Sequence, residues 1–383
     1  MSTEMNSRNK LFIKQALTSK DLNSFIDYPY TLYKDDPNWV PPLRIERREF
    51  FNPKKNPYFS HSEVAYFLAY REGRIVGRVT AHEDQNWNSH YKSRQGFFGF
   101  YESEDDPETA SALMNAAENW CKERGLKNII GPMDFNSNHE LGFQTYGFDS
   151  PPVFILKYTK EYYIKLFNDL NYHTVENLLS YDVPAQEPLP EKFAKMADRA
   201  KKLCGDFKIR NINMKKLRQE LNPILEIYNQ AWGENWGFIA MTPGEIDLLA
   251  EQFRLIADPE YIYILEKNGT IAGFLFALPD LNQALVSNRN GRLFPMNFIK
   301  VYMNFRKINK GSIILLGVKK EFRNTGMELI LMERLYSDGR RPPQKYKSIG
   351  TGWILESNKP MNAIMNFLGG KIVKRYTVLS KDI

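Results

Sequence analysis

The segment Arg323-Asn324-Thr325-Gly326 has the clearest chemical meaning in this 383-residue chain. It follows an apolar, β-branched run, Ile313 to Val318, which predicts a strand, and precedes apolar residues at three- and four-residue spacing, which predict a helix. A tight turn into a helix gathers unpaired backbone N–H groups and the positive end of the helix dipole at one point. Such a point suits a pyrophosphate, and Arg323 would add a bidentate donor. The sequence therefore predicts a phosphate-binding turn from Arg323 to Glu328.

The residues from Gly317 to Met327 resemble the acetyl-CoA-binding segment of the GNAT acyltransferase superfamily. In that segment a strand is followed by Arg or Gln, two residues, Gly, any residue, and Gly or Ala. Arg323 and Gly326 match this pattern, and Glu328 departs from it. The resemblance implies acetyl-CoA or a longer acyl-CoA as co-substrate, and no metal. The cofactor-binding residues that it implies are Gly317, Val318, Arg323, Asn324, Thr325, Gly326, Met327 and, in place of the amide that flanks the pantetheine arm, Asn358.

A carboxylate at position 328 would repel phosphate groups, so two functions stay open. The first is an acyl-CoA-dependent N-acyltransferase that transfers an acyl group to an amine, including a long-chain or lipid-like amine. The second is a non-catalytic ligand-binding protein with a degenerate GNAT fold that no longer binds CoA.

Acyl transfer to an amine needs a neutral nucleophile, a group that accepts its proton, and a donor that stabilises the oxyanion. The resemblance implies Glu356 as the base and Tyr376 as the acid, because they lie in the elements that supply these groups in GNAT enzymes. A loop or cap role for Glu356 and a packing role for Tyr376 are the alternatives.

Two loops are candidates for binding the acceptor. The first, Trp232 to Phe238, contains two Trp and two Gly, and exposing so aromatic a loop to water is costly. Its candidate acceptor-binding residues are Asn235, Trp236 and Phe238, together with Glu245 at the start of the next predicted helix. The long loop His139 to Asp149 adds Tyr146 and Asp149. A packed loop between domains, a helix-terminal carboxylate and a turn are the structural alternatives for these residues.

The segment 289–310 combines six Lys or Arg, no acidic residue and many aromatic or aliphatic residues. Such a segment could lie on an anionic membrane surface, guard the mouth of a cofactor pocket, or pack as a helix between domains with a solvated basic edge. Nucleic-acid binding is disfavoured because no helix-turn-helix, zinc-finger or RNP-type pattern accompanies it.

A faint repeat organises the elements that must position these residues. Gly73 and Gly77, in a turn between two strand patterns, reappear 196 residues later as Gly269 and Gly273, and strand, helix and strand patterns follow in the same order in both halves. The Pro-rich segment 184–190 separates them. The predicted fold is α/β, with two tandem GNAT-like units, 1–183 and 184–383, each a mixed, mostly antiparallel sheet flanked by helices.

Only the second unit has the phosphate turn, since the first has five carboxylates between Glu102 and Glu108 at the equivalent place. The whole chain resembles a bacterial tandem-GNAT group of about this length, through Asp36 to Pro42, Gly147 to Pro152 and Asn235 to Phe238. Some members of this group are associated with acylating long-chain amines in sphingolipid synthesis, which implies a lipid-like acceptor. Two copies in one chain could imitate a GNAT homodimer, so a monomer is expected.

Composition narrows the remaining classes. Hydrophobic residues make up 43% and charged residues 25%, a globular profile, and the formal charge of +7 favours anionic ligands. Two isolated cysteines and five histidines without metal-site spacing argue against a disulfide scaffold or a metal centre. The polar segment 1–10 has no secretory signal pattern, so we expect a cytoplasmic protein, with peripheral contact at the inner membrane surface through 289–310.

Overall fold

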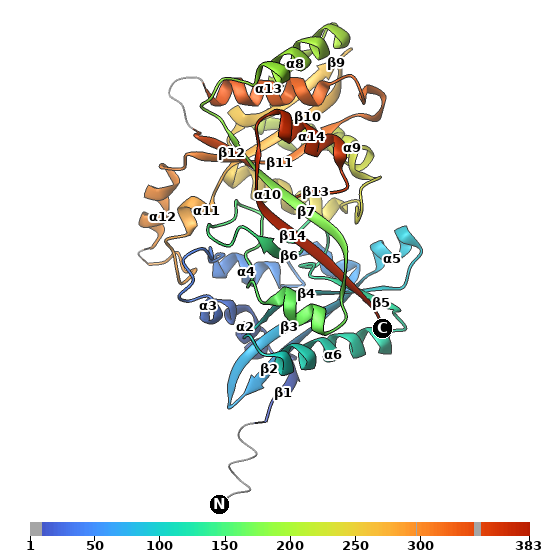
Figure 1. Ribbon diagram of the computed structural model, residues 1–383, viewed down its shortest axis with the longest axis vertical. Helices are drawn as coiled ribbons and strands as arrows, with labels where there is room; N and C mark the ends of the chain where they lie inside the picture. Colours follow the sequence, from blue (N-terminus) through green and yellow to red (C-terminus); the bar gives the residue numbers. More distant parts are fainter. Residues whose placement is uncertain (1–9, 296, 341–345) are drawn as a thin grey trace, which may run out of the picture.

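The computed structural model describes residues 10–295, 297–340 and 346–383. In these residues one twisted sheet runs through the whole molecule, with helices on both faces (Figure 1). Its strands are β1 (Phe12–Gln15), β2 (Ser62–Arg71), β3 (Arg74–Asp84), β4 (Gln95–Ser103), β5 (Asn128–Gly131), β6 (Phe143–Tyr146), β7 (His173–Pro184), β8 (Lys208–Asn211), β9 (Ile262–Lys267), β10 (Thr270–Pro279), β11 (Lys310–Val318), β12 (Ser348–Thr351), β13 (Ile354–Leu355) and β14 (Lys371–Asp382). The neighbour order is β1-β2-β3-β4-β5-β14-β7-β12-β11-β10-β9-β8, with β6 beside β14 and β13 beside β7.

The helices follow the sequence repeat. They are α2 (Ser19–Asp27), α3 (Pro29–Leu32), α4 (Arg44–Phe50), α5 (Gln85–Tyr91), α6 (Pro107–Glu123), α7 (Tyr163–Asp169), α8 (Glu191–Cys204), α9 (Leu217–Trp232), α10 (Pro243–Ile256), α11 (Asn282–Leu285), α12 (Asn297–Phe305), α13 (Met327–Gly339) and α14 (Lys359–Phe367). α6 leads from β4 to the parallel β5, and α13 leads from β11 to the parallel β12. The predicted α/β architecture, with a mixed, mostly antiparallel sheet flanked by helices in each half, is confirmed.

The repeat is visible in the turns. The β2–β3 hairpin turns at Glu72-Gly73, with φ of 53° and 76°, and the β9–β10 hairpin turns at Asn268-Gly269, with φ of 52° and 74°. Two successive residues in the left-handed region give the tight hairpin turn that matches the twist of the strands, and glycine adopts it without strain. The two turns are therefore the same device in the two copies.

The two copies exchange their closing strands. β7 ends the first copy, yet it pairs with β12 of the second, with Val183 opposite Ile349. β14 ends the second copy, yet it pairs with β5 of the first, with Leu379 opposite Gly131. Figure 1 shows the two long strands side by side, crossing the middle of the molecule. The predicted border at 183/184 falls at the last residues of β7. Each copy, as defined along the sequence, therefore places its last strand in the sheet beside a strand of the other copy.

The strand pattern after α13 is divided into β12, which pairs with both β11 and β7, and β13, which pairs with β7. The prediction for the N-terminus rests on residues 1–9, which lie outside the described part of the chain. No helix in that described part is long and apolar enough to cross a membrane.

Candidate functional site

An open strand edge lies at the centre of the second copy. β12 pairs with β11 only as far as Ile313 opposite Thr351, and the N–H of Gly352 closes this ladder on the carbonyl of Ile313 at 2.9 Å. β11 continues to Val318, but within the described residues no strand pairs with that side of it beyond Ile313. The two parallel strands therefore separate and leave backbone groups that an extended ligand can bind.

The predicted phosphate turn follows directly after β11. Asn324 and Gly326 have φ of 63° and 83°, and α13 begins at Met327. No side chain of the described residues caps this helix, so its first N–H groups face outward without a side-chain acceptor. A Cβ on Gly326 would lie 2.6 Å from the Cβ of Ala200 on α8, so the turn needs glycine both for its φ and for the close approach.

Arg323 lies at the rim of this turn. One guanidinium nitrogen is 3.4 Å from Glu234, and another donates to the carbonyl of Gln230 at the end of α9. Glu234 is 71% exposed, so this ion pair is weak and can be exchanged for a stronger anion. Glu328, which departs from the family pattern, lies in the first turn of α13 and is half-buried.

The other predicted cofactor residues contribute mainly through the backbone. A Cβ on Gly317 would lie 2.8 Å from the ring of Phe274, so only glycine fits there. Val318 and Met327 are buried, and the Thr325 hydroxyl donates to a carbonyl of the preceding turn at 2.6 Å. These side chains shape the turn, and their role in binding remains a prediction.

The first copy fills the equivalent edge with its own chain. The N–H of Met133 donates to the carbonyl of Phe98 on β4 at 2.8 Å, and the N–H of Phe100 donates to Asp134 at 2.6 Å. Asp134 is held by Lys157, whose Nζ lies 2.8 Å away, and both side chains are almost completely buried. The opening that β11 offers is thus closed beside β4.

The first copy also occupies the helix N-terminus that corresponds to that of α13. Asp106 accepts from the N–H of Thr109 at the start of α6, at 2.9 Å, and pairs with Arg71 at the same distance. A carboxylate already satisfies this helix end, so a phosphate would meet a negative charge there. Within the described residues, the open edge and the uncapped helix occur together in the second copy.

Trp232 lies on the open edge, and three further tryptophans from the two copies pack in or against the neighbouring apolar cluster. We name Trp87, Trp232, Trp236 and Trp353 the tryptophan cluster. The indole N–H of Trp232 lies 3.4 Å from the carbonyl of Leu316 on the open part of β11, and its ring lies 5.7 Å from that of Trp353. Trp87 and Trp236 form a second pair at 6.4 Å. Trp236 and Trp353 pack against one shared apolar cluster, so the open edge has an aromatic wall.

The predicted acceptor loop lies in the contact between the copies. Phe238 is buried, and its carbonyl accepts from the hydroxyl of Tyr91 on α5 at 3.0 Å. Its ring lies 5.6 Å from that of Tyr228 on α9. The carbonyl of Asn235 accepts from the N–H of Phe238, which fixes the loop as a turn. This packing brings Trp236 to the aromatic wall, and a role for the loop in binding remains a prediction.

Tyr376 and Glu356 occupy different environments. Tyr376 is 1% exposed, and its hydroxyl has no hydrogen-bond partner among the described residues. Burial, with a smaller contribution from the Glu140 carboxylate, raises the pKa of Tyr376, so it stays protonated. Glu356 is partly exposed, 3.6 Å from Arg375, and accepts from Asn177 at 3.0 Å. Glu356 thus contacts both β14 and β7 where these two strands pair.

Asn358 has a structural partner. Its side chain accepts from the N–H of Met361 at 3.2 Å and caps α14. Tyr146 is 54% exposed and lies in the sheet opposite Arg375, which is the residue that pairs with Glu356. Asp149 is also exposed, beside the loop whose carbonyls enclose the amino group of Lys374. Burial lowers the pKa of Lys374 to about 8, against the smaller opposing effect of Asp149.

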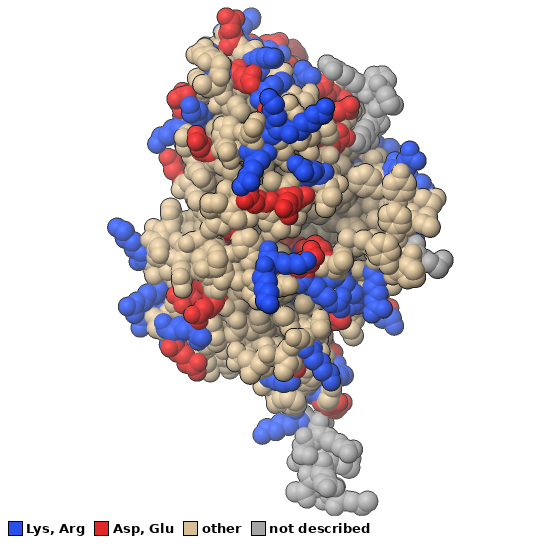
Figure 2. Space-filling view, turned by 180° about the vertical axis from the view of Figure 1, so that it is seen from behind, with Lys and Arg blue, Asp and Glu red and all other residues tan. Residues whose placement is uncertain are grey.

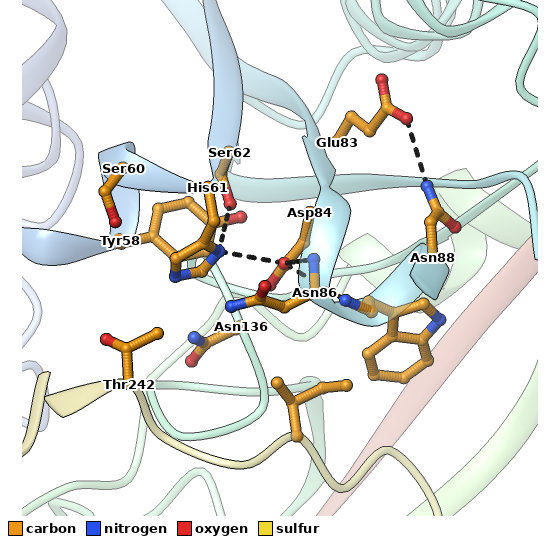
Figure 3. A network of polar contacts seen from close by, with 12 residues as sticks. Tyr58, Ser60, His61, Ser62, Glu83, Asp84, Asn86, Asn88, Asn136 and Thr242 are labelled. Carbon is orange, nitrogen blue, oxygen red and sulfur yellow. Dashed lines mark hydrogen bonds and ion pairs between the residues drawn. The ribbon is translucent and has the colours of Figure 1, made fainter. Parts of the chain in front are cut away.

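Glu245 belongs to a buried ionic network that the sequence did not predict. Figure 3 shows His61 and Asp84, the part of this network that the first copy supplies. His61 lies with Nδ1 3.1 Å from Asp84 and Nε2 3.7 Å from Glu245. Glu245 also closes a capping box with Thr242 at the start of α10 and accepts from Asn136 at 3.2 Å. Figure 3 shows Thr242 of the second copy opposite His61 and Asn136 of the first.

Opposing effects set the charges in this network. Burial alone would lower the pKa of His61, but the contacts with Asp84 and Glu245 raise it to about 9. Burial alone would raise the pKa of Glu245, but His61 and Thr242 lower it. The network therefore joins the two copies as charged groups at neutral pH. The His61–Asp84 pair had a possible sequence signal, because the β2–β3 hairpin pairs Ser62 with Asp84 and so brings the neighbouring His61 close to Asp84.

A polar recess opens at the other end of β11. Its volume is about 420 Å³, and its lining residues are Pro151, Pro152, Asp280, Asn282, Gln283, Val286, Asn304, Lys307, Asn309 and Lys310. Burial raises the pKa of Asp280 to about 6, although two backbone N–H groups and Lys310 oppose this. In the described part of the chain, no group of three or more His, Cys, Asp or Glu could hold a metal ion.

Comparisons with known proteins confirm the predicted tandem GNAT-like fold. The chain matches no protein-family model. It is 33% identical to Protein YghO of Escherichia coli strain K12 over 378 residues, which covers 97% of this chain and 95% of the relative. It is 32% identical to bacterial ceramide synthase of Caulobacter vibrioides over 371 residues, or 96% of each chain. The fold resembles a tandem GNAT protein from the clavulanic acid biosynthesis pathway, with a TM-score of 0.56, 12% identity, and 97% and 98% of the two chains covered.

Proposed function

Because the chain belongs to the family of tandem GNAT-type acyltransferases that includes bacterial ceramide synthase, we propose that it transfers an acyl group from acyl-CoA to the nitrogen of an amine. The second copy binds the acyl-CoA. The first copy serves as scaffold and supplies part of the wall around the acceptor.

The observation that carries this proposal is the difference between the two copies. In the second copy, β11 has an open edge that leads to a helix N-terminus without a side-chain cap. The two amides of a pantetheine arm can pair with such an edge as an added strand does, and the pyrophosphate can accept from the N–H groups of α13. The first copy fills both places, with Met133 and Asp134 on the edge and Asp106 on the helix.

Arg323 supports the phosphate part of the proposal. Its present partners are an exposed carboxylate and a backbone carbonyl, both weaker partners than a pyrophosphate with two negative charges. Binding exchanges these contacts for a bidentate one. Glu328 opposes binding by its charge, so we expect an affinity that depends on ionic strength.

The chemical step forms an N–C bond and breaks the C–S bond of the thioester. The amine loses a proton to a base, the carbonyl carbon becomes tetrahedral, and the thiolate leaves and takes up a proton. We propose Glu356 as the proton acceptor and Tyr376 as the donor to the thiolate. The hydroxyl of Tyr376 supports this because it is protonated and has no partner among the described residues. A buried hydroxyl without a partner costs about 1–3 kcal/mol, which a bound ligand would offset.

The acceptor in this proposal is a long-chain, lipid-like amine. The relative from Caulobacter vibrioides is named a ceramide synthase, and a ceramide is the N-acyl product of a long-chain amino alcohol. The tryptophan cluster offers the apolar wall that a long hydrocarbon chain requires. Asn235, Trp236, Phe238 and Glu245 hold the acceptor from the second copy, and Tyr146 and Asp149 from the first.

Location and assembly complete the proposal. We propose that the protein acts in the cytoplasm as a monomer. The second point is supported by the exchange of β7 and β14, which already builds inside one chain the continuous sheet that two separate copies would otherwise have to form.

Titration calorimetry with acetyl-CoA and with a long-chain acyl-CoA tests the proposal, together with mass spectrometry of a long-chain amine incubated with both. We expect heat with at least one donor and an N-acylated product. Arg323→Ala should weaken binding about tenfold. Lys165→Ala removes an exposed cation from α7 in the first copy and is the matched control. No heat with either donor at millimolar concentration would contradict the acyltransferase function and favour a ligand-binding protein that has lost CoA.

A further inference from the structure

α12 presents large apolar side chains to solvent. We name as the α12 patch the exposed side chains of Phe294, Phe298, Ile299, Tyr302, Met303 and Phe305, whose exposed fractions range from 40% to 74%. No residue of α12 itself is buried. A surface helix normally turns its apolar side to the core, so this helix is inverted relative to the usual pattern.

The patch is an ordered surface. The rings of Phe294 and Phe298 stack at 6.2 Å and 10°, and Phe298 and Tyr302 stack at 6.3 Å and 25°. Phe298 and Tyr302 are four apart in α12, which places them on one side of the helix, and Phe294 stacks on Phe298 from the segment before the helix. The opposite side holds α12 to the protein through Val301, which packs against the core, and Asn304, whose amide donates to Ser287 at 2.9 Å.

The segment before α12 is fixed to the first copy. The guanidinium of Arg289 donates to the carbonyls of Trp39 at 2.6 Å and Tyr33 at 3.2 Å. Arg44 at the start of α4 donates through its backbone N–H to Gly291 at 2.9 Å. Both copies therefore hold the patch in a defined orientation, and its exposure does not come from a loose loop.

The segment that carries the patch has charge of one sign. Residues 281–320 contain no Asp or Glu, and the basic residues Arg292, Lys300, Arg306 and Lys307 are exposed around the apolar side chains. The guanidinium carbon of Arg306 lies 5.9 Å from the ring centre of Tyr302. Figure 2 shows an area of uncharged residues (tan) with Lys and Arg (blue) gathered beside it. A partner must therefore offer both an apolar interior and negative charge.

We infer that the α12 patch docks the protein on an anionic lipid bilayer, with the aromatic side chains at the boundary between headgroups and acyl chains. Exposed aromatic side chains in a basic segment without acidic residues fit this layer, because the rings enter the apolar part and the cations meet anionic headgroups. Among the described residues no helix crosses the bilayer, so the contact is peripheral and reversible. This inference does not depend on the acyltransferase proposal.

Vesicle flotation with the full chain tests the inference. We expect binding to vesicles of phosphatidylethanolamine with phosphatidylglycerol, little binding to phosphatidylcholine, and weaker binding as salt rises. The double variant Phe298→Ser with Tyr302→Ser should reduce partition into anionic vesicles at least about tenfold. Leu255→Ser is the matched control, since Leu255 is 84% exposed on α10, and it should bind as the wild type does.

A second readout keeps the test independent of folding. In a Phe298→Trp variant, difference spectra against the wild type should show a blue shift of the added indole with anionic vesicles. Failure of the wild type to float, an unchanged partition of the folded double variant, or no blue shift would each overturn the inference. Sedimentation without lipid tests the alternative that a second copy of the chain covers the α12 patch. A dimer that the double variant abolishes would also overturn it.

Discussion

His61 of the first copy and Glu245 of the second face each other between the two copies, with 3.7 Å between Nε2 and Oε1. Asp84 holds the other ring nitrogen at 3.1 Å, so one imidazolium lies between two carboxylates. Because the three groups are almost completely buried, their charges are poorly screened by salt, and the protonation of His61 is coupled to the contact between the copies.

This coupling predicts a specific pH dependence of stability. The folded pKa of His61 is about 9, above its unfolded value of about 6.5. The group therefore stabilises the folded state fully below about pH 6.5, and this contribution is lost as pH rises through about 9. Urea unfolding of the wild type and of His61→Gln from pH 6 to 9.5 measures it. Their difference in free energy of unfolding should shrink as pH rises.

Lys374 makes the comparison between variants necessary. Its pKa is lowered to about 8, so its own titration increases stability as pH rises from about 8 toward its unfolded value. The same change occurs in both proteins and cancels in the difference. A difference that is constant over this pH range would contradict the role assigned to His61.

The turn before α13 predicts a cost for any side chain at position 326. Gly326→Ala should destabilise the protein by about 2–4 kcal/mol, because it strains a φ of 83° and brings its Cβ within 2.6 Å of Ala200. Gly269→Ala is the matched control, with a φ of 74° and no atom within 4 Å of the added carbon. It should cost only about 1 kcal/mol. Equal losses in urea unfolding would show that the contact with α8 is unimportant.

The charge of Glu328 predicts a gain of affinity. Glu328→Gln removes a carboxylate from the first turn of α13 and should tighten acyl-CoA binding about three- to tenfold at low salt, with a smaller gain at high salt. Glu251→Gln makes the same charge change at an exposed position on α10 and should have no effect. Titration calorimetry at two salt concentrations measures the acyl-CoA affinity of both variants. An affinity of Glu328→Gln equal to that of the wild type would place the phosphates away from this helix end.

The buried Asp134–Lys157 pair of the first copy predicts that removing one charge costs more stability than removing both. Asp134→Ala leaves the Lys157 charge buried without its partner and should destabilise the protein by about 3–5 kcal/mol. The double variant Asp134→Leu with Lys157→Met removes both charges and should cost clearly less. Calorimetric unfolding of both variants measures this. A double variant as unstable as the single one would mean that the Asp134 bond to the Phe100 N–H matters more than the ion pair.

Much of the chain was predictable from its sequence because the signals are local. Hairpin turns at Gly73 and Gly269, the helix repeats after Asp106 and Gly326, and the missing glycines between Glu102 and Glu108 set the two copies and their difference. Backbone sterics and hydrophobic periodicity act over a few residues, so they can be read without knowing the rest of the fold. The same reasoning indicated that only one copy keeps a phosphate turn.

The tertiary structure decided which groups meet. The sequence indicated β7 and β14 as closing strands with similar patterns, but it held no signal for their exchange, because strand pairing depends on contacts far apart in the chain. The same holds for His61 with Glu245, for Trp232 on the open edge of β11, and for the direction in which α12 turns its aromatic side chains. Local sequence sets what each segment can form, and long-range packing sets what each segment faces.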